Sequence, residues 1–380
     1  MTQTLWLRAE SRLNERRAPL IPVHAGILVR NGHRVIVESS ADRIFPDSLW
    51  REQGCVLVAN GSWRFARDDA LILGLKELPD ESFALRHRHM YFAHAYERQR
   101  GAAALLERFR CGGGMLYDLE HIKDRFGAQL VTGGAGYFAG IAAAVACIAV
   151  WKQKLRDEAA PYRVPTEFPS VSELVAYARN LVRQDLTPPR ILIIGHRGKS
   201  GRGVAHLLEA IGLEYDCAPK ITNDNLQVRE QLHDYELIFN CIKLAHDTPL
   251  FLSEAMIGPK TKIRLIGDIS CEATHPCNPI ALYSNPTSFA APVCRTKTGI
   301  DIMAIDNITA MLPVECSEIL SEQIFPYLCS FLLAGGMYDA SPLQRMVGAF
   351  HTACDSLETD VAEATVCSVC GADRSSVSPA

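Results

Sequence analysis

A glycine-rich loop is the most specific local signal for chemistry in this 380-residue sequence. Residues 191–203 read ILIIGHRGKSGRG, so an apolar run is followed by Gly195, Gly198 and Gly201 and then by apolar residues at helical spacing. Where a strand turns through glycines into a helix, the N–H groups of the helix N-terminus can approach the pyrophosphate of a dinucleotide. The spacing is a variant of the usual G-x-G-x-x-G, and a tight turn without a ligand is the alternative. The loop therefore predicts a dinucleotide but not a reaction.

An acidic residue lies where recognition of the adenosine ribose would require one. Residues 213–216 could form the next strand, which would end at Asp216, about 20 residues after the first glycine of the loop. A carboxylate there would accept hydrogen bonds from the ribose hydroxyls and repel a 2′-phosphate, so NAD is favoured. Three cations beside the loop leave NADP open, because they could accommodate that phosphate: Arg197, Lys199 and Arg202.

Four ionisable residues lie at or beside the ends of strands expected in the first 130 residues. They are Arg17, Lys76, His94 and Glu120. Charged residues that end apolar strands commonly face a cleft, where they can bind a polar substrate or move protons. Each residue also has a structural alternative, such as a surface ion pair for Lys76, a hydrogen-bonded core histidine for His94 and a salt bridge for Arg17.

The chain around these residues alternates strand and helix signals, which predicts an α/β fold. In the first 130 residues, strands are expected at 4–9, 33–39 and 69–78, and helices at 22–31 and 97–109.

A second α/β unit is expected to open with the strand at 191–195. A proline-rich connection precedes it and contains a helix at Val171–Arg183, and further strands are expected at 235–242 and 262–270. From about residue 319 the pattern is helical again. The small, polar residues 371–380 are predicted to be a disordered tail.

The composition limits the class of protein and its partners. A net charge of −4, with Lys and Arg scattered, argues against nucleic acid and favours a small-molecule substrate. Most of the 13 cysteines stand singly in apolar stretches, and the charged N-terminus leaves no room for the apolar core of a signal peptide, so a cytoplasmic location is expected. The uncharged run 130–151 could cross a bilayer by length, but a buried helix is the favoured interpretation and no membrane partner is expected.

A series of motifs, in unbroken order up to about residue 330, resembles the NAD-dependent, lysine-forming saccharopine dehydrogenase family. Together these motifs are far more specific than the glycine loop alone. They are RAE at 8–10, RAPLIP at 17–22, GLKELP at 74–79, FAHAY at 92–96, LYDLE at 116–120, GYFAG at 136–140, the loop at 191–201, DISCE at 268–272 with NP at 278–279, and AIDN at 304–307 with LP at 312–313.

The resemblance implies an α/β fold of two Rossmann-like domains, with parallel-rich sheets and an active-site cleft between them, related to alanine dehydrogenase. The predicted substrate domain, alanine dehydrogenase-like, comprises residues 1–135 plus 320–370 and so includes both parts of the chain that flank the second domain. The predicted NAD-binding domain comprises residues 136–319.

The resemblance also implies a set of site residues, with Lys76 and His94 as the acid–base pair and with NAD as the cofactor. The substrate-binding positions would be Arg17, Gln99, Glu120, Ser270, Cys271 and Glu272. The cofactor-binding positions would be Gly195, Gly198, Lys199, Gly201, Asp216, Lys243, Ile269, Ile305, Asp306, Asn307 and Ile308.

Oxidation of a secondary amine explains why such groups are needed. The nitrogen must be neutral before hydride leaves the adjacent carbon, and water must then add to the imine while a proton is delivered to the departing amine. Lys76 would need a lowered pKa for the first step, which burial and Arg17 could supply. His94 suits the proton-shuttling steps, and Arg17 could bind a substrate carboxylate bidentately.

The sequence departs from the family where substrate carboxylates would bind. An arginine pair usual in the family corresponds to the uncharged segment Gly127, Ala128 and Gln129, and a usual lysine corresponds to Glu97. A usual cofactor-side tyrosine corresponds to Lys243. Losing a cation that faces a dicarboxylate costs about 1.5–3 kcal/mol of charged hydrogen bonding. A substrate other than saccharopine is therefore favoured.

The predicted function is reductive condensation of an amino acid or amine with a keto acid or aldehyde, or its reverse. Three alternatives stay open. The first is a true lysine-forming saccharopine dehydrogenase with a rearranged pocket, in which Lys243 supplies the missing charge. The others are an alanine dehydrogenase-like enzyme that releases ammonia and a non-catalytic NAD-binding regulatory protein.

Two pairs of potential metal ligands are not expected to bind metal. Cys367 and Cys370 are half of a zinc motif without a second C-x-x-C, so an exposed pair in the tail is the favoured interpretation. His87 and His89 would face one side of a strand, with no nearby acid to complete a ligand shell.

Overall fold

The chain forms two compact units, Met1–Gly133 with Ser317–Ala380 and Gly134–Cys316. The structure is a computed structural model and describes residues 2–79, 81–96, 101–132, 135–183, 187–222, 226–245, 247–273, 275, 277–333 and 342–370; at 135, 226–228 and 357–370 only the backbone is described. The sequence predicts boundaries after residues 135 and 319, and the units divide after Gly133 and Cys316. The predicted tail at 371–380 lies outside the described residues.

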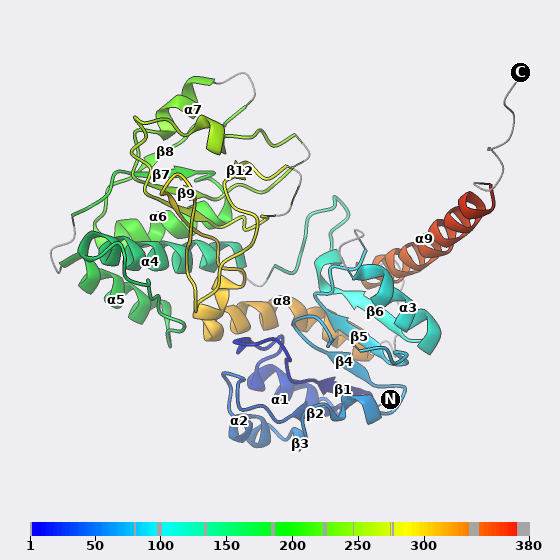
Figure 1. Ribbon diagram of the computed structural model, residues 1–380. Coiled ribbons are helices and arrows are strands. Elements are labelled where there is room, and N and C mark those ends of the chain that lie inside the picture. The colour runs from blue at the N-terminus through cyan, green and yellow to red at the C-terminus, as the bar shows by residue number, and fades with distance from the viewer. Residues whose placement is uncertain are drawn as a thin grey trace, which may run out of the picture. The chain divides into compact units, whose positions relative to one another are not determined.

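The first unit is built on a six-stranded sheet in the order β3-β2-β1-β4-β5-β6, and all of its pairings are parallel (Figure 1). Its order reverses between β1 and β4, and such a switch point is where doubly wound sheets bind ligands. The strands are β1 (Thr4–Leu7), β2 (Arg34–Glu38), β3 (Val56–Val58), β4 (Leu71–Leu73), β5 (Arg88–Tyr91) and β6 (Met115–Asp118).

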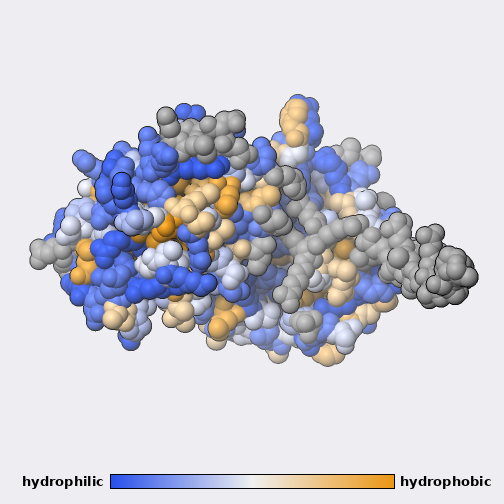
Figure 2. All heavy atoms as spheres, turned by 45° about the horizontal axis from the view of Figure 1, so that its top comes forward, coloured by the Kyte–Doolittle hydropathy of each residue, from blue (hydrophilic) through white to orange (hydrophobic). Residues whose placement is uncertain are grey.

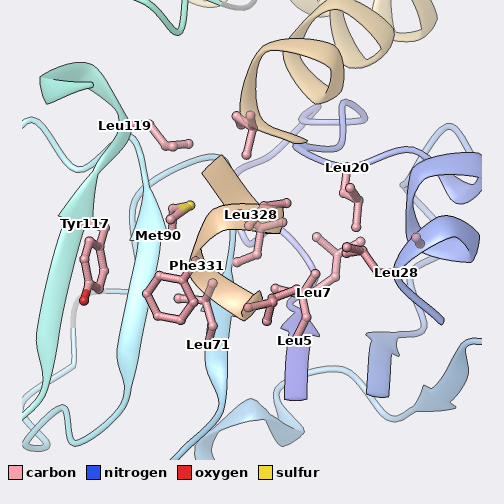
Figure 3. Close-up of a cluster of buried hydrophobic side chains, with 14 of the residues drawn as sticks. Leu5, Leu7, Leu20, Leu28, Leu71, Met90, Tyr117, Leu119, Leu328 and Phe331 are labelled. Atoms are coloured by element: carbon pink, nitrogen blue, oxygen red, sulfur yellow. The ribbon is translucent and has the colours of Figure 1, made fainter. Parts of the chain in front are cut away.

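Successive apolar side chains of these strands point to opposite faces of the sheet. Each face therefore packs against its own set of helices. In β1, Leu5 and Leu7 lie in one cluster with Leu328 and Phe331, as Figure 3 shows, and Trp6 lies in the cluster on the other face. The helices and turns of this unit are α1 (Pro22–Arg30), α2 (Asp47–Glu52), η1 (Ser62–Phe65), α3 (Ala102–Gly112), η2 (Leu119–His121), the later part of α8 (Pro313–Leu333) and α9 (Pro342–Cys370).

The second unit has its own six-stranded sheet, in the order β13-β14-β11-β9-β7-β8. All pairings are parallel except β13 with β14, and the order reverses between β7 and β9. The strands are β7 (Ile191–Ile194), β8 (Asp216–Cys217), β9 (Leu237–Asn240), β11 (Leu265–Asp268), β13 (Cys294–Arg295) and β14 (Asp301–Met303), with β10 (Leu252–Ser253) and β12 (Ile280–Ala281) paired separately.

Helix α4 (Ala135–Arg156) is the buried helix that the uncharged run predicts. Its span Gly136–Arg156 is long and apolar enough to cross a membrane, but 83% of the most apolar window is buried inside the protein. The face drawn in Figure 2 is mainly hydrophilic, and its apolar residues form separate patches. The other helices and turns of this unit are α5 (Val171–Arg183), α6 (Lys199–Ile211), α7 (Leu226–Leu232), η3 (Glu254–Met256) and η4 (Ile308–Met311).

Three predicted boundaries are wrong. The strand expected at 213–216 begins at Asp216 instead of ending there. The helix expected from residue 97 begins at Ala102, after Gly101 in a left-handed conformation at φ 85°. Helix α8 begins at Pro313, earlier than the expected residue 319, because proline is well tolerated in the first turn of a helix.

Helices α4 and α6 cross at two glycines that let their backbones approach closely. A Cβ atom built at Gly203 would lie 2.0 Å from the carbonyl oxygen of Tyr137, and one at Gly140 would lie 2.0 Å from that of Ser200. Real Cβ contacts are never that short, so both positions require glycine. This crossing fixes α6, and with it the helix N-terminus at the glycine loop.

We expect Gly203→Ala to destabilise the protein. Alanine raises helix propensity by roughly 0.5–1 kcal/mol, but overpacking against backbone atoms costs about 1–3 kcal/mol and dominates. The urea midpoint, followed by circular dichroism, should fall. The matched control is Gly258→Ala, because no atom lies within 4 Å of a Cβ there. A Gly203→Ala protein as stable as the control would contradict the crossing.

Candidate active site

Lys76 follows β4 at the switch point of the first sheet, and residues after β1 hold its backbone. The carboxylate of Glu10 accepts hydrogen bonds from the N–H groups of Leu75 at 2.8 Å and Lys76 at 2.9 Å. Arg8 donates to the Lys76 carbonyl oxygen and forms an ion pair with Glu10 at 3.3 Å. A Cβ atom at Gly74 would lie 2.2 Å from Nε of Arg8, so the buried guanidinium requires glycine there.

The surroundings of Lys76 lower its pKa. Burial of the side chain is the largest cause, followed by the positive charges of Arg17 and Arg12, and the carboxylates of Glu15 and Glu77 oppose them. These are the two causes that the sequence predicts, burial and Arg17. Lys76 therefore has a larger neutral fraction near neutral pH than an exposed lysine, which is what a proton acceptor needs.

Arg17 is committed to a carboxylate of the protein itself. Its Nε donates to Oε1 of Glu15 at 2.7 Å and its Nη2 to Oε2 at 2.5 Å, and both side chains are buried. The sequence analysis predicts that this guanidinium binds a substrate carboxylate through two hydrogen bonds. The edge formed by Nε and Nη2 already bonds to Glu15, so a substrate could not use that edge without displacing Glu15.

His94 lies in a strained loop that follows β5 and is held by a buried carboxylate. Its φ of 51° is left-handed, which is uncommon for a residue other than glycine. Asp118, fully buried at the end of β6, accepts hydrogen bonds from the N–H groups of Ala93 at 3.2 Å, Ala95 at 3.1 Å and Glu120 at 3.2 Å. The bonds on either side of His94 compensate the strain and fix its backbone.

Glu120 forms a hydrogen bond with His94, and the two change each other's pKa. Nδ1 of His94 lies 2.6 Å from Oε2 of Glu120, and this bond is the main cause that raises the pKa of His94 and lowers that of Glu120. The positive charge of Lys76 opposes the rise at His94, so the two bases interact electrostatically. The Glu120 bond outweighs the effect of Lys76, so the pKa of His94 stays raised.

The glycine loop of the second unit has the geometry of an anion cradle. Gly195 is left-handed at φ 81°, and Cβ atoms at Gly195 and Gly201 would lie 2.9 Å or less from backbone atoms. Gly198 caps α6 without any side-chain hydrogen bond, and the first turn of α6 holds no acidic residue. The exposed helix N-terminus fits the pyrophosphate of a dinucleotide. A Cβ atom at Gly198 would lie 3.3 Å from the carbonyl oxygen of Gly195, so this position also favours glycine.

Other predicted cofactor and substrate positions follow the neighbouring strands β9, β11 and β14. Hydrogen bonds join these strand ends: the Asn240 amide at the end of β9 donates to Asp268 of β11 at 2.9 Å, and Sγ of Cys271 donates to the Ala304 carbonyl oxygen after β14 at 3.1 Å. Because parallel strands end at a common edge, these positions come together with the glycine loop. They are Lys243 after β9; Ile269, Ser270, Cys271 and Glu272 after β11; and Ile305, Asp306, Asn307 and Ile308 after β14.

Asp216 is the predicted cofactor residue that the structure does not bring to the glycine loop. It pairs with Leu192 in the register of β7 and β8, three positions before Gly195. Its Oδ2 accepts a hydrogen bond from the Tyr235 hydroxyl at 2.9 Å and lies 3.7 Å from the guanidinium of Arg190. Arg190 and Tyr235 precede β7 and β9, so this carboxylate belongs to the amino-terminal edge of the sheet.

Three residues considered in the sequence analysis lie partly or wholly outside the described residues. Gln99 is among residues 97–100, which the structure does not describe. Cys367 and Cys370 have backbone positions within α9, but their side chains are not described. Among the residues that are described, no cluster of three or more His, Cys, Asp or Glu side chains could hold a metal ion. His87 and His89 are buried in an aromatic cluster with Trp63.

Sequence reasoning missed the carboxylates that support the reactive groups. Glu10, Glu15 and Asp118 hold Lys76, Arg17 and His94 respectively. Two of them lie inside quoted motifs, RAE at 8–10 and LYDLE at 116–120, so the signal was present. Their roles depend on which backbone N–H groups they reach, and this is a property of the folded loops.

Comparison with known proteins gives two kinds of similarity. Residues 6–133 match the family described as alanine dehydrogenase/PNT, N-terminal domain. A saccharopine dehydrogenase [NAD(+), L-lysine-forming] of Schizosaccharomyces pombe is 35% identical over 340 residues, 85% of this chain and 92% of that protein. The enzyme of the same name from Emericella nidulans is 34% identical, over 85% of this chain and 91% of its own length.

Solved structures show the same fold at low sequence identity. An L-alanine dehydrogenase has a TM-score of 0.65 and 15% identity, and the alignment covers 92% of this chain and all of that one. A transhydrogenase from Sinorhizobium meliloti has a TM-score of 0.59 and 14% identity, with 91% and 97% covered. The predicted α/β fold of two Rossmann-like, parallel-rich sheets is confirmed.

We expect Glu120→Gln to lower the pKa of His94. The substitution removes the main cause of the raised value, whereas burial and the charge of Lys76 still favour the neutral ring. The protonated form of His94 should therefore be lost at a lower pH than in the wild type, which NMR titration of the histidine ring measures. Glu107→Gln is the control, because Glu107 pairs with Arg110. An unchanged His94 titration would contradict the proposed coupling.

Proposed function

Because this chain belongs to the NAD-dependent, L-lysine-forming saccharopine dehydrogenase family, we propose that it acts on the C–N bond of a secondary amine whose identity differs from saccharopine. The chain is an NAD-dependent amino-acid dehydrogenase that acts on CH–NH donors. The proposal adds the reaction, which is condensation of an amine with a keto acid or aldehyde, or its reverse. Small molecules are its partners.

The observation that carries this proposal is the pair of bases in the first unit. Lys76 and His94 follow the neighbouring parallel strands β4 and β5. Burial lowers the pKa of Lys76, and the Glu120 hydrogen bond raises that of His94. Chemistry at a secondary amine needs two proton transfers, one at nitrogen and one at the water that attacks the imine carbon. A dehydrogenase that transferred only hydride would need fewer proton transfers.

The cofactor is NAD, and the exposed N-terminus of α6 fits its pyrophosphate. When bound, NAD accepts or returns the hydride of the substrate carbon. Gly195 and Gly201 allow the close backbone approach, and the uncapped N–H groups after Gly198 would hold the phosphates. The residues after β11 and β14 would border the same site.

The residues of the first unit would move the protons. In the oxidative direction, neutral Lys76 takes a proton from the substrate ammonium, which leaves the free nitrogen electron pair that imine formation requires. His94 then takes a proton from the water molecule that adds to the imine carbon, and the Glu120 carboxylate stabilises the resulting imidazolium. His94 returns that proton to nitrogen and the C–N bond breaks, which releases the amine. The neutral imidazole then accepts the hydroxyl proton, which leaves the carbonyl product.

The hairpin at residues 122–130 supports a substrate other than saccharopine. Asp124 accepts hydrogen bonds from the N–H groups of Phe126 and Ala128, both at 2.8 Å, and Gly127 is left-handed at φ 84°. The segment 127–129 that leaves this turn carries no charged side chain. A dicarboxylate would lose about 1.5–3 kcal/mol for a missing cation there.

Saccharopine itself is the second candidate, and one observation favours it. Lys123 lies on the same hairpin, and its positive charge contributes to lowering the pKa of Glu120. A cation therefore lies within electrostatic reach of the His94–Glu120 pair despite the uncharged segment 127–129. Lys123 could attract a substrate carboxylate in place of the family arginines.

A cytoplasmic location also belongs to the proposal. The cysteines whose side chains the structure describes are free thiols, and several of them, including Cys147 and Cys241, are buried as small apolar groups. Free thiols in this number are typical of a reducing compartment.

We expect a screen of amine and carbonyl pairs to identify the substrate through oxidation of NADH. A pair other than lysine with 2-oxoglutarate should give the highest kcat/KM. If lysine with 2-oxoglutarate gives the highest kcat/KM, saccharopine is the substrate. In that case only the proposal of a different secondary amine fails. Turnover with ammonia as the sole amine would assign an alanine dehydrogenase-like reaction. Bound NADH without turnover on any pair would indicate a regulatory protein.

With the best pair, Lys76→Met and His94→Gln should each reduce kcat by roughly 10²–10⁴-fold, the usual contribution of an acid–base group. The controls carry the same substitutions at exposed positions, Lys260→Met and His351→Gln, and should stay within about twofold of the wild type. Circular dichroism would verify that all four proteins are folded. Activity retained by Lys76→Met would refute the proposed mechanism.

A further inference from the structure

The carboxylate that should select NAD over NADP lies at the wrong edge of its sheet. In doubly wound sheets the cofactor binds beyond the carboxyl ends of the strands, where an acid at the end of the second strand contacts the ribose. Asp216 begins β8, and its carboxylate bonds to Tyr235 and lies beside Arg190, at the amino ends of β9 and β7. With a rise of about 3.3 Å per residue, three positions place it roughly 10 Å back from Gly195.

The register of β8 identifies what takes the place of this acid. Cys217 pairs with Ile193, and the N–H of Ala218 donates to the Ile193 carbonyl oxygen at 2.9 Å. Continuing the pairing brings Pro219 opposite Gly195, and the next residue is Lys220, which is exposed. The position that usually carries a ribose-binding acid is therefore followed by a cation.

The charges of residues 195–222 are separated between the two edges of the sheet. Four exposed cations lie toward the carboxyl-terminal edge, where the cofactor would bind: Arg197, Lys199, Arg202 and Lys220. The carboxylates within the same range follow a different pattern. Glu209 is near the end of α6 and bonds to the Tyr215 hydroxyl at 2.7 Å, and Glu214 and Asp216 lie at the start of β8.

We propose that the cofactor site accepts NADPH as well as NADH, with Lys220 and Arg197 as the residues that meet the 2′-phosphate. This inference rests on the proposed cofactor site of the second unit. A monoester phosphate carries about −1.5 to −2 charges at neutral pH, and guanidinium and ammonium groups are its usual protein partners. An acid would repel it, but Asp216 is separated from this edge and already has two partners.

Binding of both cofactors to the whole protein tests the inference without any substrate. Nucleotide fluorescence would be titrated with enzyme at one fixed salt concentration, because phosphate binding depends on ionic strength. We expect the Kd for NADPH to lie within about tenfold of that for NADH, a difference of at most about 1.4 kcal/mol. Binding of NADH but not NADPH would overturn this inference alone. Binding of neither nucleotide would overturn the proposed function as well.

Charge variants then identify the residues. Lys220→Glu should weaken NADPH binding by a factor at least about tenfold larger than the factor for NADH binding. Lys220→Gln should show a smaller effect in the same direction. Lys262→Glu is the matched control, since Lys262 is an exposed lysine that pairs with Asp234 before β11. It should leave the ratio of the two affinities within about twofold of the wild type. Equal effects at both lysines would refute a local role for Lys220.

Asp216→Asn tests the displaced carboxylate directly. If Asp216 does not contact the ribose, the Kd values for NADH and NADPH should both stay within about twofold of the wild type. A selective gain in NADPH affinity in this variant would show that Asp216 repels the 2′-phosphate, and the inference would then be wrong. Circular dichroism of each variant would establish that a change in binding is not a change in folding.

Discussion

Parallel strands all end at the same edge of a sheet, and this constraint decides where each unit can do chemistry. Their carbonyl ends and the loops that follow are gathered on one side, whereas the opposite edge receives only the returning helices. In the first unit, the loops after β1, β4, β5 and β6 bring together Glu10, Lys76, His94 and Glu120. In the second unit, the same rule gathers the glycine loop with the residues after β9, β11 and β14.

Buried carboxylates then turn this crowded edge into defined geometry. The carboxylate oxygens of Asp118 and Glu10 accept hydrogen bonds from backbone N–H groups, so these residues fix loops and do not bind substrate. The Glu15 carboxylate accepts hydrogen bonds from the Arg17 guanidinium, and its negative charge partly offsets the positive charges that act on Lys76. The Glu120 hydrogen bond raises the pKa of His94. Burial and the charges of Arg17 and Arg12 lower the pKa of Lys76, and the carboxylate of Glu15 opposes this lowering. The supports thus position the two bases and also change when they titrate.

Prediction from the sequence worked best where a local pattern is sufficient. The apolar run at 191–194 followed by glycines specifies a strand, a turn and a helix, because a Cβ atom at Gly195 or Gly201 would collide with backbone atoms and Gly195 is also left-handed. The uncharged run after residue 130 likewise specifies a buried helix. Prediction from the sequence was less reliable at helix boundaries such as Pro313 and Ala102, where capping and the preceding loop decide where a helix begins.

The sequence by itself determined the α/β class and the strand, glycine turn and helix at the loop, since these depend on residue types and short spacings. The proposal of Lys76 and His94 as the acid–base pair came from the resemblance to the family. Only the tertiary structure decided what those residues contact. Arg17 and Glu15 are near neighbours in the chain, yet their bidentate pairing requires a particular loop conformation. Asp216 has the expected separation from Gly195, but the register between β7 and β8 assigns it to the opposite edge. Separation along a chain does not specify strand register, because register is chosen by hydrogen bonds and packing between strands.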